Sequence, residues 1–163
     1  MRKAKPRSKK RGGGLASGSF GAREVAFLVK TKTPAVKAGP LIGFTLDLMD
    51  EMEIEGSVAV ELCSVDRIAG LNEKFRHKQG PTDVLAFECG ESDESGLRHL
   101  GDLVICPRVA QSNGKRLGHS LDQELRRLLL HGLLHLCGYD HETDKGRMSR
   151  KERALCRKLG LPE

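Results

Sequence analysis

The stretch SLDQELRRLLLHGLLHLCGYDH, residues Ser120–His141, carries the strongest structural signal in the chain. Ser120 followed by Gln123 is a capping-box pattern, which marks the beginning of a helix. Leucines then recur at helical spacing, and Gly138 sits where a left-handed cap would end the helix. The pattern predicts a helix over 120–137 that lies at the centre of the fold, because its leucine face is the most apolar surface of the chain.

The segments before and after this helix predict an alternation of strands and helices. Residues 57–63 (SVAVELC), for example, alternate between apolar and polar side chains and are rich in β-branched residues, as a half-buried strand is. Strands are predicted over 24–30, 57–63, 82–88 and 101–106, and further helices over 35–52, 65–75 and 144–159, with a short one entered at Pro107. We therefore expect an α/β (α+β) fold, a single domain with a mixed sheet of about four strands covered by helices.

Positive charge is concentrated at the N-terminus. The 163 residues carry a formal net charge of +6, but residues 1–23 alone carry +8 and contain no acid. Such a segment has too little apolar surface to fold, so we predict a basic flexible arm over 1–23 and one domain over 24–163. The arm suits attraction to nucleic-acid phosphate, a solubilising terminus or an organelle transit peptide, and the sequence leaves these three open.

The cysteines and the apolar runs bear on where the protein works. Five cysteines, an odd number without a Cys-x-x-Cys pair, favour a reducing compartment. No apolar run approaches the roughly 20 residues that cross a bilayer, and no hydrophobic segment of a secretory signal follows the basic terminus. We expect a cytoplasmic protein without membrane contact.

Three histidines within HGLLHLCGYDH predict a metal site. His131 and His135 lie four residues apart on the predicted helix and project from one face, and the turn at Gly138 lets His141 return toward them. Three neutral imidazoles suit one zinc ion and leave a fourth position for water, whereas magnesium and calcium prefer oxygen ligands. The alternative is that these are ordinary core or capping histidines. Cys137 is the nearby candidate for a fourth ligand, but its helical position points elsewhere.

The same spacing occurs in metzincin proteases, H-E-x-x-H-x-x-G-x-x-H, where the glutamate is the general base. Gly132 occupies the position of that glutamate here. The peptidase mechanism therefore lacks its base. Because glycine also weakens a helix, Gly132 predicts the close approach of another element or of substrate behind the metal.

The sequence resembles the YbeY family, the bacterial endoribonucleases and rRNA maturation factors. The histidine motif resembles the family signature, and LNEKFRHKQGPTDVLAF (71–87), GDLVICP (101–107) and GHS (118–120) resemble its other landmarks. The resemblance covers about residues 24–160, outside the basic arm. One departure is Ala86, where the family more often has serine.

The resemblance implies a mixed α/β domain, a zinc ion held by three histidines, and cleavage of single-stranded RNA in rRNA maturation and ribosome quality control. It maps the family's critical arginine onto Arg76 and its first metal ligand onto His131, which are the catalytic candidates. The implied partners are single-stranded RNA or rRNA and components of the small ribosomal subunit, with no small-molecule cofactor.

Chemistry suggests a role for each remaining candidate. The fork of Arg76 could clamp a phosphate and neutralise charge in the transition state, although an isolated arginine is more often a surface ion pair. Asp140 either bonds to a metal ligand such as His141 and orients it, or is a turn residue. His77 is a possible RNA contact. With aromatic residues at 4%, we expect phosphate contacts to dominate and sequence preference to be weak.

Three functions remain open from sequence: a metal-dependent endoribonuclease, a zinc hydrolase of another substrate such as a peptide or ester, and a ribosome-assembly factor in which zinc is structural. Gly132 argues against the second. A His131 variant separates the first from the third, because in the endoribonuclease it should stay folded and bound to RNA and yet lose cleavage.

Overall fold

A computed structural model describes residues 14–31 and 34–163. Its elements, in chain order, are β1 (Leu15–Phe20), β2 (Arg23–Val29), α1 (Ala38–Glu51), β3 (Gly56–Leu62), α2 (Val65–Arg76), β4 (Val84–Glu88), β5 (His99–Ile105), α3 (Pro107–Leu117), α4 (Leu121–Leu136) and α5 (Arg147–Leu159). The strands form one sheet in the order β1-β2-β3-β5-β4. The sheet is mixed, because β2, β3 and β5 are parallel while β1 and β4 are antiparallel edge strands. The predicted fold class is confirmed.

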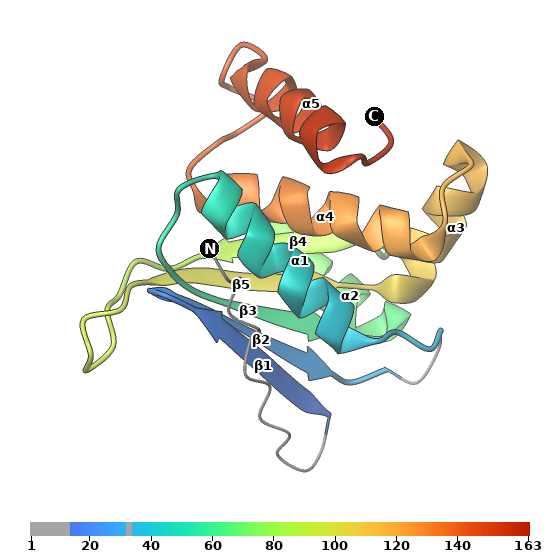
Figure 1. The fold of residues 1–163 in the computed structure, drawn as a ribbon. Coiled ribbons are helices and arrows are strands. Elements are labelled where there is room, and N and C mark those ends of the chain that lie inside the picture. The colour runs from blue at the N-terminus through green and yellow to red at the C-terminus, as the bar shows by residue number, and fades with distance from the viewer. Residues whose placement is uncertain (1–13, 32–33) are drawn as a thin grey trace.

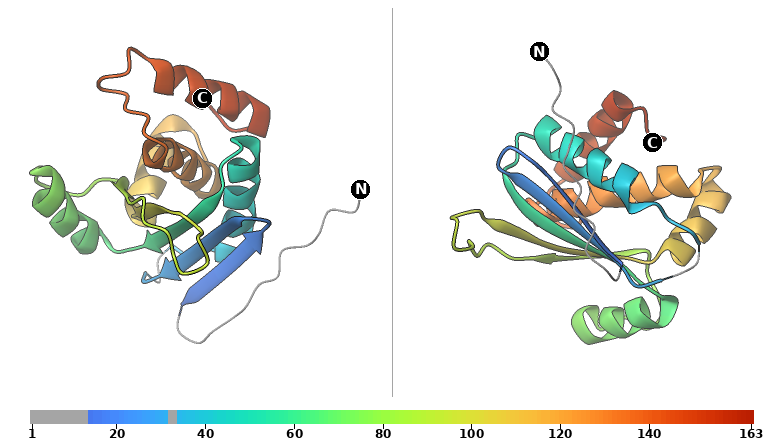
Figure 2. Two further views of the ribbon diagram at one scale, coloured as in Figure 1. Left: turned by 90° about the vertical axis from the view of Figure 1, so that its left-hand side faces the viewer. Right: turned by 60° about the horizontal axis from the view of Figure 1, so that its bottom comes forward.

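The helices cover the sheet unequally. α1 and α4 lie over one face, and α5 packs beyond them on the outside (Figure 1). α2 lies on the opposite face (Figure 2). Each predicted strand has its counterpart among β2 to β5, and its ends differ from the predicted ends by at most two residues. Within the described residues, no helix is both long and apolar enough to cross a membrane.

The prediction that 1–23 forms a flexible arm is wrong for its second half. Residues Leu15–Phe20 form β1, and each pairs with a residue of β2. The physical reason is that this stretch, LASGSF, carries no charge, while seven of the eight basic residues of 1–23 precede it. Gly18 allows β1 to approach α1, since a Cβ there would lie 2.6 Å from Ile42 Cγ2. Residues 1–13 lie outside the described part, so the prediction for them is not addressed.

The main core lies between the sheet and α1 and α4. α4 is central, as predicted, because it packs on β4 and β5 below and on α1, α3 and α5 around it. Its leucines Leu129, Leu130, Leu133 and Leu134 are fully buried. A second, smaller apolar cluster, which the sequence did not predict, lies on the α2 side of the same sheet and comprises Cys63, Ile68, Leu85, Val104 and Cys106.

The helix at Pro107 is longer than predicted. α3 extends to Leu117 through a polar segment that contains Gly114, whereas the sequence predicted only a short helix. Gly114 is the reason that it can. A Cβ there would lie 3.2 Å from the His119 carbonyl oxygen and 3.3 Å from Glu124 Cβ, so the missing side chain lets α3 pack closely on α4.

Gly132 has the packing role that its position predicted. A Cβ at residue 132 would lie 2.7 Å from Cδ2 of Leu103, a fully buried side chain of β5. The glycine thus lets α4 pack closely against β5, next to the edge strand β4.

Replacing Gly132 with alanine should therefore destabilise the protein. The added methyl group overpacks against Leu103 at a cost of about 1–3 kcal/mol, which exceeds the ~1 kcal/mol that alanine gains in helix propensity. The matched control is Gly70→Ala in α2, where the same atom meets open space and should stabilise the protein. Urea unfolding of both variants checks this, and an increase in stability for both would contradict the packing argument.

Candidate metal centre and adjoining cleft

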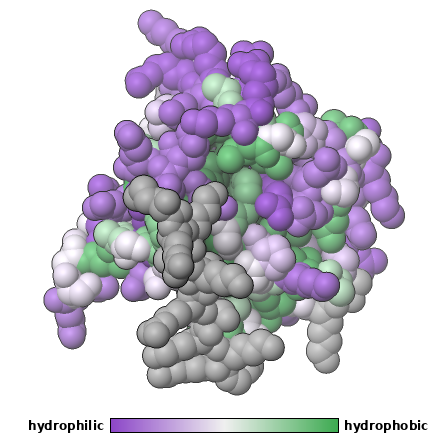
Figure 3. All heavy atoms as spheres, viewed as in Figure 1, coloured by the Kyte–Doolittle hydropathy of each residue, from purple (hydrophilic) through white to green (hydrophobic). Residues whose placement is uncertain are grey.

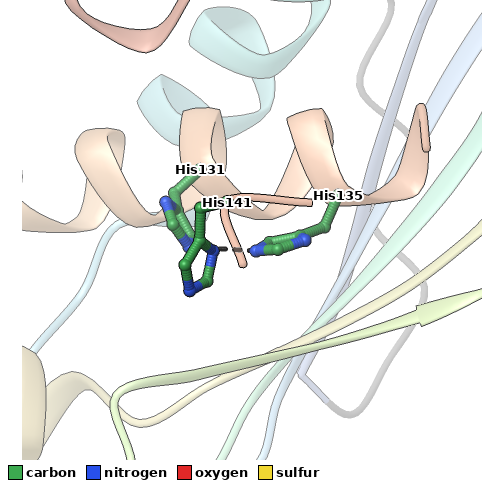
Figure 4. Close-up of side chains that lie close together, drawn as sticks. All are labelled: His131, His135 and His141. Carbon is green, nitrogen blue, oxygen red and sulfur yellow. Dashed lines mark hydrogen bonds between the residues drawn. The ribbon is translucent and has the colours of Figure 1, made fainter. Parts of the chain in front are cut away.

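Three histidines converge beside α4. His131 and His135 project from one face of the helix, and His141 comes from the loop that follows. Gly138, with φ 83°, reverses the chain so that His141 turns back toward the helix. One ring nitrogen of each histidine lies within 4.8 Å of the others. Figure 4 shows the rings facing a common point, with His131 Nε2 and His135 Nε2 3.2 Å apart.

This arrangement fits a metal ion. Nitrogen ligands of a tetrahedral zinc ion at ~2.1 Å lie about 3.4 Å apart, close to the distance between the His131 and His135 nitrogens. Burial, together with the neighbouring His131 and His141, lowers the pKa of His135 below its usual value, which keeps this imidazole neutral and able to donate its lone pair. Cys137 is not part of the cluster.

A carboxylate from α5 supports the first histidine. Glu152 Oε1 lies 3.2 Å from His131 Nδ1, on the side of the ring away from the cluster. Burial would raise the pKa of Glu152, but its hydrogen bond with His131 and the charges of His131 and Arg127 leave the pKa below its usual value. The ionised carboxylate accepts a hydrogen bond from the Nδ1–H group, so that Nε2 is left free for a metal. Carboxylate–histidine pairs of this kind orient metal ligands in many zinc proteins.

Arg76 and two of the histidines line one cleft. The cleft has a volume of about 440 Å³, and its lining includes Arg76, Phe75, His135, Asp140 and His141. Arg76 is the last residue of α2 and is exposed, whereas the two histidines come from the end of α4 and the loop after it. The structure thus brings together an arginine and a histidine cluster that are far apart in the sequence.

Comparison with known proteins places this site in a family. Residues 34–160 match the family model "Endoribonuclease YbeY". The chain belongs to the YbeY endoribonuclease family. A YbeY endoribonuclease of Koribacter versatilis is 42% identical over 135 residues, which are 83% of this chain and 86% of the relative. That of Nautilia profundicola is 42% identical over 71% of this chain and 78% of the relative.

A solved structure also resembles the fold. The solution structure of TM1509 from Thermotoga maritima aligns with a TM-score of 0.55 and 29% identity, over 80% of this chain and 85% of that one. The YbeY family match includes all three histidines and Arg76, and it excludes β1 and β2. The resemblance inferred from the sequence motifs is confirmed.

Asp140 serves the loop that carries His141. Its Oδ1 accepts a hydrogen bond from the Glu142 backbone N–H at 3.0 Å, and its Oδ2 accepts one from Thr143 Oγ1 at 2.9 Å. These bonds, the backbone bond first, lower the pKa of Asp140. Of the two roles left open by the sequence, the hydrogen bonds favour the turn residue, which holds His141 in place through the backbone.

The loop after Arg76 is anchored by a buried amide. Asn72 Nδ2 donates to the Gly80 carbonyl oxygen at 2.9 Å, which ties residues 77–80 back onto α2. His77 ends α2 in a left-handed conformation with φ 55° and is exposed. Among the described residues it is not part of the cleft lining. Its contact with RNA stays a prediction.

Glu152 is the site residue that sequence reasoning missed. A signal for it exists, because it is the one acid of α5 and falls on the same face as the buried Met148, Leu155 and Cys156. A lone carboxylate on the apolar face of a basic helix requires a partner. The sequence does not identify that partner, since it depends on how α5 packs against α4.

Replacing Glu152 with glutamine should weaken metal binding by about 10- to 100-fold, the usual effect of losing a carboxylate behind a histidine ligand. The fold should persist, because the amide is nearly the same size. Competition with a chromogenic chelator measures the affinity. Asp122→Gln, on the exposed end of α4, is the control that should leave it unchanged. Equal affinity in the Glu152 variant and wild type would show that the carboxylate does not support the ligand.

Proposed function

We propose that this chain is a zinc-dependent endoribonuclease that cleaves single-stranded RNA in the maturation of ribosomal RNA. The observation that carries this proposal is the single cleft lined by Arg76 and by His135 and His141. Membership of an endoribonuclease family supplies the reaction class. The zinc ion rests on the donor set, since three imidazole nitrogens favour zinc over the oxygen-seeking magnesium and calcium.

Each residue of the site has a defined task. His131, His135 and His141 hold the metal, which supplies Lewis acidity and an activated water when bound. Glu152 keeps the proton of the neutral His131 ring on Nδ1, so that the lone pair of Nε2 is free to bind the metal. Arg76 reaches the phosphate from the other side of the cleft, where its planar fork pairs with two phosphate oxygens and offsets the charge that develops as the bond breaks.

The cleft favours an unpaired strand as substrate. A single strand can lay its backbone into a narrow cleft, whereas the backbone of a duplex is held by pairing in a fixed helical form. Phe75 lies beside Arg76, is 53% exposed and lines the cleft, so it offers one base a surface to stack on. The other contacts between protein and RNA are expected to be with phosphate groups. Because every nucleotide carries the same phosphate, the sequence preference should be weak.

A peptidase or esterase of the metzincin type is disfavoured by the packing. The position that would need a glutamate base is Gly132. The side chain of Leu103 occupies the space that a side chain at residue 132 would need. A side chain with a carboxylate could not enter there without displacing the buried side chain of Leu103. This supports RNA over a peptide as substrate.

Ribosomal RNA and components of the small ribosomal subunit are the partners that we propose, and the cytoplasm is the proposed compartment. The unpaired cysteines support a reducing environment, because the described structure contains five free thiols, of which Cys63, Cys106 and Cys156 are buried. Burial raises the pKa of Cys63 to about 12, so this thiol is unreactive and acts as a small apolar side chain.

The substrate class can be tested with one RNA in two forms. Purified full-length protein loaded with zinc should cut a labelled single-stranded RNA at internal positions and leave the same RNA intact when it is annealed to its complement. A protein that cuts both forms equally, or only removes terminal nucleotides, would contradict the proposal.

A further inference from the structure

In the folded domain, α5 carries a net positive charge and the remaining residues together carry a net negative charge. α5, with the sequence RMSRKERALCRKL, has six basic residues and one acid, a net charge of +5. The other residues from 24 onward sum to −7. A compact domain that is acidic elsewhere thus carries one strongly basic helix on its outside. Figure 3 shows hydrophilic side chains covering this helix at the top of the molecule.

The basic side chains of α5 are available to a partner. The helix packs through Met148, Leu155 and Cys156, and all six basic residues, which are Arg147, Arg150, Lys151, Arg153, Arg157 and Lys158, are exposed on the outer half. Arg157 pairs with Glu163, and Lys158 pairs with Glu51. In the part of the chain that the structure describes, Arg147, Lys151 and Arg153 have no ion-pair partner.

The helix is fixed next to the proposed reaction site. Its one acid, Glu152, is the residue that bonds to His131. Asp144 holds the start of the helix in place, because its carboxylate accepts the backbone N–H groups of Gly146 and Met148 at 3.0 Å and 2.7 Å. The basic face therefore has a set position relative to the metal ligands.

A second cleft leads from the histidines toward α5. It has a volume of about 460 Å³ and is lined by His131 and Glu152 together with Arg116, Arg127 and Asn113, among others. The first cleft contains His135, His141 and Arg76. Both clefts therefore adjoin the histidine cluster, one through His131 and the other through His135 and His141. A strand that passes Arg76 and continues beyond the cluster can enter the second cleft, where Glu152 of α5 forms part of the wall.

We propose that the exposed face of α5 binds the sugar–phosphate backbone of the RNA strand on the side of the cleavage site opposite Arg76. The inference rests on the proposed function, because it takes the RNA substrate of that site as the ligand. Phosphates repeat along the strand, and arginine and lysine side chains on successive turns of a helix can neutralise several of them. A charge-based contact of this kind holds RNA of any sequence.

The test compares two pairs of charge-neutralising substitutions. Lys151→Gln with Arg153→Gln changes α5, and Lys30→Gln with Arg67→Gln changes the opposite side of the molecule by the same charge, at two exposed residues that flank Glu61. Binding of a single-stranded RNA is measured at several salt concentrations in full-length proteins that all carry His141→Ala, so that the RNA is not cleaved.

The α5 variant should bind less tightly at low salt, and its plot of log affinity against log salt should be shallower than that of the wild type by about 1.4, since each phosphate contact to a single strand contributes about 0.7. The control variant should keep the wild-type slope. With His141 retained and at saturating concentrations of RNA, the α5 variant should cleave at the wild-type rate, because its substitutions do not touch the reacting atoms.

Equal salt slopes for the wild type and the α5 variant would overturn the inference. An equal loss of RNA affinity in the α5 variant and the control variant would overturn it too, because it would show that α5 makes no specific contact with the RNA. Failure of the proposed function gives a different result. In that case the wild type would not cleave ordinary single-stranded RNA at all, whatever its binding slopes.

Discussion

Replacing Arg76 with alanine is expected to lower the rate of RNA cleavage by about 100- to 1000-fold, the usual effect of removing one donor that stabilises transition-state charge. Folding and metal content should stay near wild type, because Arg76 is exposed at the end of α2 and is not a metal ligand. The measurement is single-turnover cleavage of a labelled single-stranded RNA, with thermal unfolding and metal analysis of the same sample.

Two further variants define the role of this side chain. Arg76→Lys should recover only part of the lost rate, because a point charge cannot reproduce the two-pronged geometry of a guanidinium. Arg67→Ala removes an arginine from the same helix, where it pairs with Glu61, and should leave cleavage unchanged. If Arg76→Ala cleaved at the wild-type rate at every salt concentration, the proposed mechanism would lose its main protein residue, and a binding role would become the better explanation.

Replacing His141 with alanine is expected to remove the metal and, with it, cleavage. His141 lies in an exposed loop, so its loss should not unfold the protein, and two histidines alone hold a metal weakly. A metal supplies several kcal/mol of charge stabilisation, so its loss should lower the rate by about 1000-fold or more. Metal analysis, circular dichroism and cleavage of the same preparation check the three parts of this prediction.

A parallel variant, His131→Ala, tests the same ligand set from the helix side, where the change also leaves Glu152 without its partner. Both variants should keep their affinity for RNA. That outcome separates an enzyme from an assembly factor with structural zinc, in which loss of a ligand would unfold the domain or abolish RNA binding. Wild-type cleavage by a folded, metal-free His141 variant would refute the proposed role of the cluster.

The features that the sequence predicted are those that depend on nearby residues. The capping box at Ser120 and Gln123 forms as expected. The histidines could be assigned to one site because helical spacing and one glycine turn determine where their side chains point. Even the close approach at Gly132 followed from a local observation, a glycine in a helix interior.

The features that the sequence did not predict depend on distant partners. β1 is a strand because β2 offers it an edge to pair with, and its small residues give a weak signal by themselves. Glu152 meets His131 only because α5 packs across α4. Arg76 became a candidate only through the family resemblance, since residue spacing does not show that the end of α2 and the end of α4 line one cleft.

The central claim is that three histidines hold a metal ion on which RNA cleavage depends. Its most direct test is metal analysis of the purified full-length protein alongside single-stranded RNA cleavage before metal removal, after it, and after zinc is restored. We predict one zinc ion per chain, no cleavage by the stripped protein and recovery when one equivalent of zinc is added. Cleavage by the stripped protein at the original rate would contradict the claim.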